Sequence, residues 1–157
     1  MVTTFATVSG SGPVDVCFDP SGNAYVLTYG WGLSNGVYIQ KVTTPGAVVT
    51  TVAGADAKGF LDHADPLQAL FALAGSSIAY HSTGMVVTDR ANFCYRRYDP
   101  DQTNAIATAA GTCTTSGSTL DPLLFLDPSG IAISADGTLF MAERSAGVIK
   151  KLTPGGV

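Results

Sequence analysis

The chain has 157 residues, enough for one domain with its own hydrophobic core. Its 8 Lys and Arg against 12 Asp and Glu leave a net charge of −4, which argues against a nucleic-acid partner. No apolar run approaches the length of a membrane span, so no membrane partner is expected either. Eighteen Gly, eight Pro and many Thr, Val and Ala are typical of short strands joined by frequent turns. The composition therefore predicts an all-β protein.

The first repeated unit begins with PVDVCFDPSGNAYVLT at residues 13–28. After an insertion that contains Trp31, it continues with YIQKVTTPGAVVTTVAG at residues 38–54. Short apolar runs alternate with turns rich in Gly and Pro, a pattern that predicts four antiparallel strands. We therefore expect a four-stranded unit at about residues 13–54.

Two later parts of the chain repeat this pattern. SIAYHSTGMVVTD and NFCYRRYDPDQTNAIATAAG form a second unit at about residues 77–111. PSGIAISADGTLFMAE and GVIKKLTPGGV form a third at about residues 128–157, with only three strands. Four strands in a repeat of roughly 40 to 50 residues are typical of a β-propeller blade. The sequence thus predicts one domain of three blades.

A Phe closes each segment that connects two units. GFLDHADPLQALF ends at Phe71 and STLDPLLF ends at Phe125, each six or seven residues before the Ile that opens the next strand. Large aromatic side chains at repeated positions are usually buried. We therefore expect both rings to pack between adjacent units, and residues 67–73 to form no more than a short helical turn.

The order of these motifs resembles the NHL repeat, a type of β-propeller blade. The resemblance rests on GFLDH, ALF, SIAYHSTGMVVTD, NFCYRRYD and IATAAG in the second unit, and on LDPLLFLDPSGIAISADGTLFMAE and VIKKLTPGG in the third. It covers nearly the whole chain, although the first unit has no Gly-Phe-x-Asp segment and the second lacks the usual Pro. The resemblance implies a propeller that commonly has six blades, of which this chain would supply three.

Three blades cannot close a ring, because about four are the usual minimum. The third unit lacks a fourth strand, and the N-terminal segment matches the fourth-strand sequence VTTVAG of the first unit. This assembly strand, at about residues 2–10, includes Val2, Thr3, Thr4, Phe5, Ala6, Thr7 and Val8. We expect it to complete the third unit of a second copy, giving a strand-exchanged homodimer of six blades. The alternatives are a three-blade fragment of a longer chain and an open head-to-tail polymer.

One face of such a propeller carries the loops after the second and fourth strands, where binding sites are common. The candidate ligand-binding residues on this face are Trp31, Asp62, His63, Asp89, Arg90, Asn92, Glu143 and Arg144. A protein or carbohydrate ligand is expected, because an aromatic ring on a rigid scaffold can hold either. For Asp89 and Glu143 the competing interpretation is a structural ion pair or cap with Arg90, Arg96 or Arg144.

The sequence contains none of the common hydrolase, zinc-protease, P-loop or dinucleotide motifs. The weak metal-ligand candidates are Asp62, His63 and Asp65, since a carboxylate can orient an imidazole beside a divalent ion. The alternative function is accordingly a six-bladed lyase or hydrolase with a divalent metal in its channel. With only two histidines in the chain, we favour a non-enzymatic module without a cofactor.

Three cysteines allow at most one disulfide within the chain. Cys94 falls in the third strand of the second unit and Cys113 lies just beyond the fourth, so a bridge is geometrically feasible. It would close a loop of about 18 residues and stabilise the fold by roughly 3 kcal/mol. Cys17 is expected to be a small, buried thiol. The location of the protein is open, but a bridge between Cys94 and Cys113 would favour an extracellular one.

Overall fold

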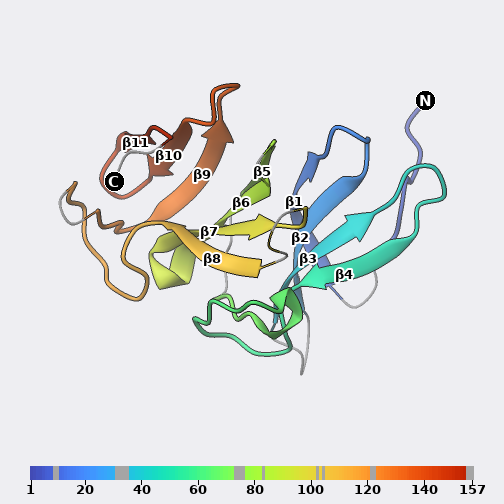
Figure 1. Cartoon of the computed structure of the whole chain (residues 1–157), viewed down its shortest axis with the longest axis horizontal. Coiled ribbons are helices and arrows are strands. Elements are labelled where there is room, and N and C mark those ends of the chain that lie inside the picture. The colour runs from blue at the N-terminus through green and yellow to red at the C-terminus, as the bar shows by residue number, and fades with distance from the viewer. Residues whose placement is uncertain are drawn as a thin grey trace.

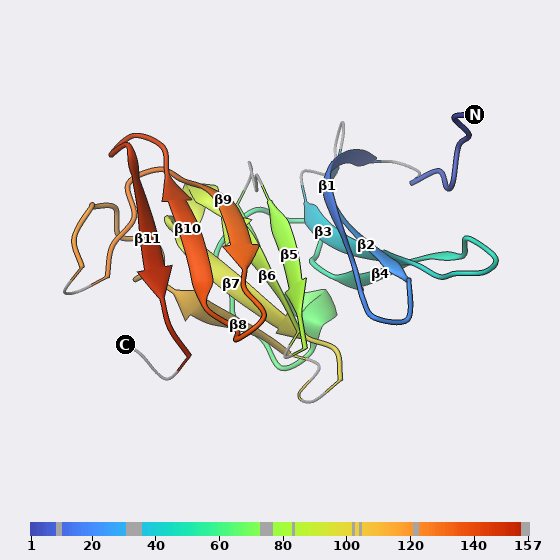
Figure 2. The ribbon, with the colours of Figure 1, turned by 90° about the horizontal axis from the view of Figure 1, so that it is seen from above.

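The computed structural model describes residues 1–8, 11–30, 36–72, 77–82, 84–101, 103, 105–120 and 123–154. Within these ranges the protein is all-β, as predicted, with three separate antiparallel sheets arranged in a row (Figures 1 and 2). No helix in the described ranges is long and apolar enough to cross a membrane.

Each sheet is formed by consecutive segments of the chain. Sheet 1, in the order β1-β2-β3-β4, contains β1 (Ser11–Phe18), β2 (Ala24–Gly30), β3 (Val37–Val42) and β4 (Val49–Ala53). Sheet 2, in the order β5-β6-β7-β8, contains β5 (Ile78–His81), β6 (Gly84–Asp89), β7 (Cys94–Asp99) and β8 (Ala105–Ala110). Sheet 3, in the order β11-β10-β9, contains β9 (Pro128–Ile133), β10 (Leu139–Glu143) and β11 (Val148–Leu152). The three sheets correspond to the three predicted units.

A glycine with positive φ lies in or next to the turn between the first two strands of each sheet. The φ angles are 82° at Gly22, 112° at Gly84 and 84° at Gly137, a region that side chains with a Cβ rarely adopt. At Gly84 a Cβ would also lie 2.5 Å from the carbonyl oxygen of Tyr98. Gly22 and Gly137 occupy the same turn position, each donating its backbone N–H to the carbonyl three residues earlier, whereas Gly84 opens β6 opposite His81.

Two 3₁₀ turns complete the secondary structure of the described chain, η1 (Pro66–Gln68) and η2 (Arg90–Asn92). The Asp65 carboxylate caps η1 by accepting a hydrogen bond of 3.0 Å from the backbone N–H of Leu67. The predicted short turn in this connection is thus confirmed.

Two hydrophobic clusters lie between neighbouring sheets. One joins side chains of sheets 1 and 2 around Phe71, and the other joins side chains of sheets 2 and 3 around Phe125. Both rings are buried, so the prediction that they pack between adjacent units is confirmed. Because each Phe ends a connecting segment, the chain covers one edge of the interface as it passes between sheets.

Among the described residues, sheets 1 and 3 each have one face without a neighbouring sheet. Apolar side chains remain exposed there, including Phe18 of sheet 1 at 58% and Phe140 and Ile149 of sheet 3 at 39% and 72%. Residues 1–8 form no strand and are largely exposed. Residues 1–8 and β11 lie at opposite ends of the row of sheets (Figure 1).

Candidate functional site

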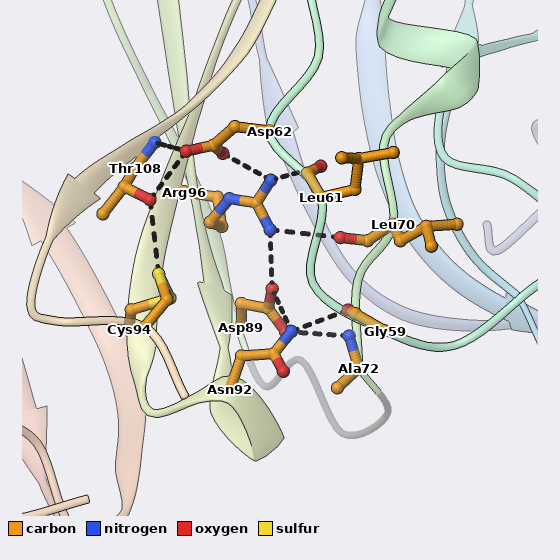
Figure 3. The surroundings of a disulfide bond; sticks show 11 residues. Gly59, Leu61, Asp62, Leu70, Ala72, Asp89, Asn92, Cys94, Arg96 and Thr108 are labelled. Atoms are coloured by element: carbon orange, nitrogen blue, oxygen red, sulfur yellow. Dashed lines mark hydrogen bonds and ion pairs between the residues drawn. A yellow bond between two sulfur atoms is a disulfide. The ribbon is translucent and has the colours of Figure 1, made fainter. Parts of the chain in front are cut away.

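A buried network centred on Arg96 fixes the connection between sheets 1 and 2. The guanidinium group on β7 is 0% exposed, and its Nη1 donates to Asp89 Oδ2 at 3.0 Å and to the Leu70 carbonyl at 3.1 Å (Figure 3). Its Nη2 donates to the Leu61 carbonyl at 2.8 Å and lies 2.5 Å from Asp62 Oδ1. We call this cluster the Arg96 anchor, because it attaches the connecting segment to sheet 2.

Aromatic rings and the edge of β8 complete the Arg96 anchor. The rings of Phe60 and Phe71 lie 4.8 and 5.1 Å from the guanidinium carbon, within the range of cation–π attraction. Asp62 Oδ2 accepts hydrogen bonds from the backbone N–H and the hydroxyl of Thr108, at 3.0 and 2.9 Å (Figure 3). The carboxylate of Asp62 therefore joins the connecting segment to β8 as well as to β7.

Asp89 and Asn92 point into this network. Asp89 Oδ1 accepts a hydrogen bond from the Ala72 backbone N–H at 3.0 Å, and Asn92 Nδ2 donates to Asp89 Oδ2 at 2.9 Å and to the Gly59 carbonyl at 2.8 Å (Figure 3). Burial raises the pKa of Asp89, while the hydrogen bonds from Asn92 and Ala72 and the charge of Arg96 oppose that rise. In this arrangement both side chains serve as structural links.

Sheet 3 contains a second arrangement of the same kind, the Lys150 anchor. Lys150 Nζ on β11 donates to the Leu124 carbonyl, lies 3.5 Å from Glu143 Oε2, and lies 4.6 Å from the centre of the Phe125 ring. Glu143 Oε2 in turn accepts a hydrogen bond of 2.9 Å from the Leu126 backbone N–H. Glu143 therefore occupies in sheet 3 the position that Asp89 occupies in sheet 2.

Asp127 links the loops of sheets 2 and 3 at the surface. Its Oδ1 lies 2.5 Å from Arg90 Nε, and its Oδ2 accepts bonds from Arg144 Nε at 2.8 Å and from the Ser145 hydroxyl at 3.0 Å. The hydrogen bond from Arg90 contributes most to lowering the pKa of Asp127 to about 2, with further contributions from Arg144 and Ser145. Arg144 is 63% exposed, so this surface cluster is accessible to a ligand.

The segment with the metal candidates lies beside the outer strand of sheet 2. His63 pairs through its backbone with Ile106 of β8, by hydrogen bonds of 3.1 and 2.9 Å, and its Nδ1 accepts from the Asp65 backbone N–H at 3.0 Å. Asp62 is engaged by Arg96. In the described ranges no three His, Cys, Asp or Glu side chains form a group that could hold a metal ion. Trp31, the aromatic candidate, lies outside the described residues.

The predicted disulfide is present. Cys94 at the start of β7 is bonded to Cys113 beyond β8, with Cα atoms 5.0 Å apart. Cys17 is a free, partly buried thiol. Burial, with smaller contributions from the charges of Asp15 and Asp19, raises the pKa of Cys17 to about 12, so the thiol stays protonated at neutral pH.

The candidate residues are therefore divided between interior and surface. Asp89, Asn92 and Glu143 lie in the two anchors, whereas Arg90 and Arg144 meet at Asp127 on the surface. The candidate site residues did not include Arg96, Lys150 or Asp127, although Arg96 is one of the arginines considered above as an ion-pair partner of Asp89 or Glu143. A signal for the first two was present, because a cation on the third strand follows an acidic residue that ends the second strand in both units.

A comparison with protein-family models and with curated proteins gave no match for this chain. The repeated geometry of the three sheets and the surfaces that it leaves uncovered are therefore the observations that bear on function.

Proposed function

We propose that the chain is half of a six-bladed propeller of the NHL type, completed by a second copy, and that it acts as a non-enzymatic assembly module. Its loop face, where Arg90 and Arg144 meet at Asp127, would bind a protein or glycan. One observation carries the proposal: the uncovered faces of sheets 1 and 3 present counterparts of the residues that meet at the two internal interfaces.

The strand registers make these counterparts explicit. On the face directed toward the following sheet, equivalent cross-strand pairs are Tyr25 with Lys41, Val86 with Arg97, and Phe140 with Lys151. The Tyr25 ring is buried against sheet 2, and Val86 is buried against sheet 3. Phe140 is the third member of this series and has no following sheet.

The opposite face of each sheet, directed toward the preceding sheet, carries a second series of equivalent residues. Tyr80 packs into the first interface and Ile133 into the second, and Phe18 is their equivalent in sheet 1. The rings of Tyr25 and Tyr80 stack with centroids 6.5 Å apart. If sheet 1 of one copy docks on sheet 3 of another, Phe18 and Phe140 would meet in the same way. Two such contacts related by a two-fold axis would close the assembly.

The assembly strand has a defined register in this proposal. In sheet 1 Val49 is opposite Val42, and in sheet 2 Ile106 is opposite Tyr98. The equivalent third-strand residue of sheet 3 is Leu152, so Val2 of a second copy would pair opposite it. Covering an open strand edge in this way satisfies its backbone groups and removes an aggregation hazard.

The proposal also covers the chemical class of the loop-face ligand and the compartment in which the protein works. Arg144 is an exposed guanidinium that Asp127 orients, which suits hydrogen bonding to hydroxyl or carboxylate groups of a glycan or protein. A disulfide between Cys94 and Cys113 is typical of oxidising compartments, so we infer an extracellular setting.

Sedimentation equilibrium at micromolar concentration tests the assembly. The expected result is a species of twice the 16.1 kDa chain mass. Phe18→Asp and Phe140→Asp should each give monomers, because every interface of the closed dimer contains one of each ring. An equimolar mixture of the two variants should recover a heterodimer, since one of its two interfaces keeps both phenylalanines.

The matched control is Leu67→Asp, which alters an exposed leucine of η1 away from both free faces and should leave the dimer intact. Deleting residues 1–8 should weaken the dimer without unfolding the chain. A wild-type monomer, an open polymer series, or failure of the mixed variants to associate would overturn the closed-dimer proposal.

A further inference from the structure

A cavity of about 510 Å³ lies between sheets 2 and 3, beside the open edge of β11. Its lining includes Ile133, Leu139 and Leu152 on the side of sheet 3, and Ala107 and Ala109 of β8 on the side of sheet 2. Among the described residues β11 is the last strand of its sheet (Figure 2). The cavity therefore lies where a fourth strand of sheet 3 would place its side chains.

The interface between sheets 1 and 2 shows what occupies the equivalent space. The fourth strand of sheet 2 is present there, and its Ile106 lies opposite Tyr98. Ile106 is 2% exposed and belongs to the hydrophobic cluster between the two sheets. Because Leu152 is the counterpart of Tyr98, the cavity is the space of a side chain equivalent to Ile106.

Val2 is the residue that would take this position in the exchanged strand. In the register given above, Val2 of a second copy lies opposite Leu152, and residues directly opposite one another project from the same face of a sheet. Since Leu152 lines the cavity, Val2 would enter it. In the single chain the Val2 side chain is fully exposed, so the exchange would remove it from water.

The threonines of the fourth strands support the same register. Thr51 of sheet 1 and Thr108 of sheet 2 lie opposite the third-strand residue that is equivalent to Lys150. In both strands an aliphatic residue precedes this threonine by two positions. The exchanged strand repeats the pattern, because Val2 precedes Thr4 and Thr4 would lie opposite Lys150.

The side chains around the cavity are smaller than their counterparts in the first interface. The pairs of residues, with the member from the second interface first, are Val86 and Tyr25, Ile133 and Tyr80, Leu139 and Met85, Leu152 and Tyr98, and Ala107 and Thr50. Val2 is also one methylene smaller than Ile106. An isopropyl group fills only part of a space of about 510 Å³, so a larger aliphatic side chain at position 2 would fit better.

We propose that this cavity is the seat of the Val2 side chain of a second copy, and that residue 2 determines how tightly the exchanged strand is held. The cavity selects an aliphatic side chain, because its wall at the edge of β11 is aliphatic, and it favours one larger than valine. This inference rests on the proposed function, since it assigns the side-chain contact that retains the exchanged strand.

Sedimentation equilibrium of variants at position 2 tests the assignment. Val2→Ile adds one buried methylene group at each of the two exchanged strands and should lower the dimer dissociation constant roughly 10-fold. Val2→Asp should raise it roughly 100-fold or more, because a carboxylate without a partner is costly to bury against an aliphatic wall. The matched control is Val48→Ile, which adds the same group where Val48 is 60% exposed, and should leave the constant unchanged.

A substitution in the opposite wall tests the same contact from the acceptor side. Ala107 lines the cavity and is exposed in the single chain, so Ala107→Leu should extend into the space without disturbing the fold. It should weaken the dimer and remove the advantage of Val2→Ile. Additive effects of these two substitutions would overturn the assignment. An unchanged dissociation constant in both Val2→Ile and Val2→Asp would also overturn it, while leaving the dimer in place.

A peptide of residues 1–8 separates this inference from a failure of the dimer. Added to the Phe140→Asp chain, whose substitution lies on the other face of sheet 3, the peptide should shift the methyl resonances of Ile133 and Leu152. The same peptide with Val2→Asp should not. These shifts would support the seat of Val2 even if the wild-type chain were monomeric. No shift at roughly 5 mM peptide, above the constants of weak millimolar sites, or equal shifts with both peptides, would overturn it.

Discussion

The Arg96 anchor and the Lys150 anchor hold equivalent parts of two sheets with different chemistry. Arg96 divides its guanidinium nitrogens between two carboxylates and two backbone carbonyls. Lys150 has one nitrogen, which donates to the Leu124 carbonyl and lies 3.5 Å from both the Thr119 carbonyl and the Glu143 carboxylate. Gln40 is the equivalent residue of sheet 1. The comparison teaches that a buried cation occurs where a connecting segment brings its carbonyl oxygens to the third strand.

Removing the cation of the Arg96 anchor should have the largest effect on stability. Arg96→Met leaves Asp89 buried without its ionic partner, and such a loss typically costs about 3 to 5 kcal/mol of the free energy of unfolding. Urea denaturation followed by circular dichroism measures it. The control is Arg97→Met, one residue away on the opposite face, which should cost less than about 1 kcal/mol. Equal losses for the two variants would contradict the anchor.

Removing the disulfide should have the next largest effect on stability. The bridge lies in sheet 2, the sheet that holds the Arg96 anchor, and sheet 3 has no counterpart among the described residues. Thr108, which binds Asp62, has its hydroxyl 3.3 Å from Cys113 Sγ, so the bridge lies at the margin of that network. Replacing Cys94 and Cys113 together with Ala should lower the free energy of unfolding by about 3 kcal/mol. Thiol titration of the native, unreduced protein should detect only Cys17, and Cys17 should react slowly because its thiol is partly buried and protonated. Finding three rapidly reacting thiols would contradict the bridge.

The Lys150 anchor should be the weaker of the two. Lys150→Met should cost about 2 kcal/mol, the scale of hydrogen bonds to charged groups, because Glu143 keeps its backbone donors without the lysine. The same denaturation experiment allows a direct comparison with Arg96→Met. If Lys150→Met lowers the free energy of unfolding as much as Arg96→Met or more, the number of contacts that the cation makes does not determine the relative stability of the two anchors.

Removing the Asp127 carboxylate from the surface cluster should have the smallest effect on stability, and this effect should depend on pH. The pKa of Asp127 is lowered from 3.8 to about 2, so its contribution to stability is present above about pH 4 and is lost as the pH falls toward 2. Asp127→Asn should therefore be slightly less stable than wild type at pH 6 and indistinguishable from it near pH 2. Thermal unfolding midpoints at pH 6, 4 and 2 test this, and a constant difference would contradict the assignment.

Most of the sheet structure could be predicted because it depends on local patterns. Turn glycines, alternating apolar residues and Pro or Gly breaks indicated the strands. The disulfide could be predicted because Cys94 and Cys113 are close in the chain. The candidate site was harder, since the same acidic residue at a strand end can face solvent or a buried cation, and only a distant segment decides between them.

The sequence by itself determined three antiparallel units, their turns and the burial of Phe71 and Phe125, since strand alternation and glycine turns act over a few residues. Only the tertiary structure decided that Asp89 and Glu143 turn inward, that the segment around His63 lies along β8, and that a cavity lies beside the packed interface of sheets 2 and 3. These features depend on how long connecting segments fold back and on the fit of side chains from different sheets. Neither can be read from the spacing of residues along one strand.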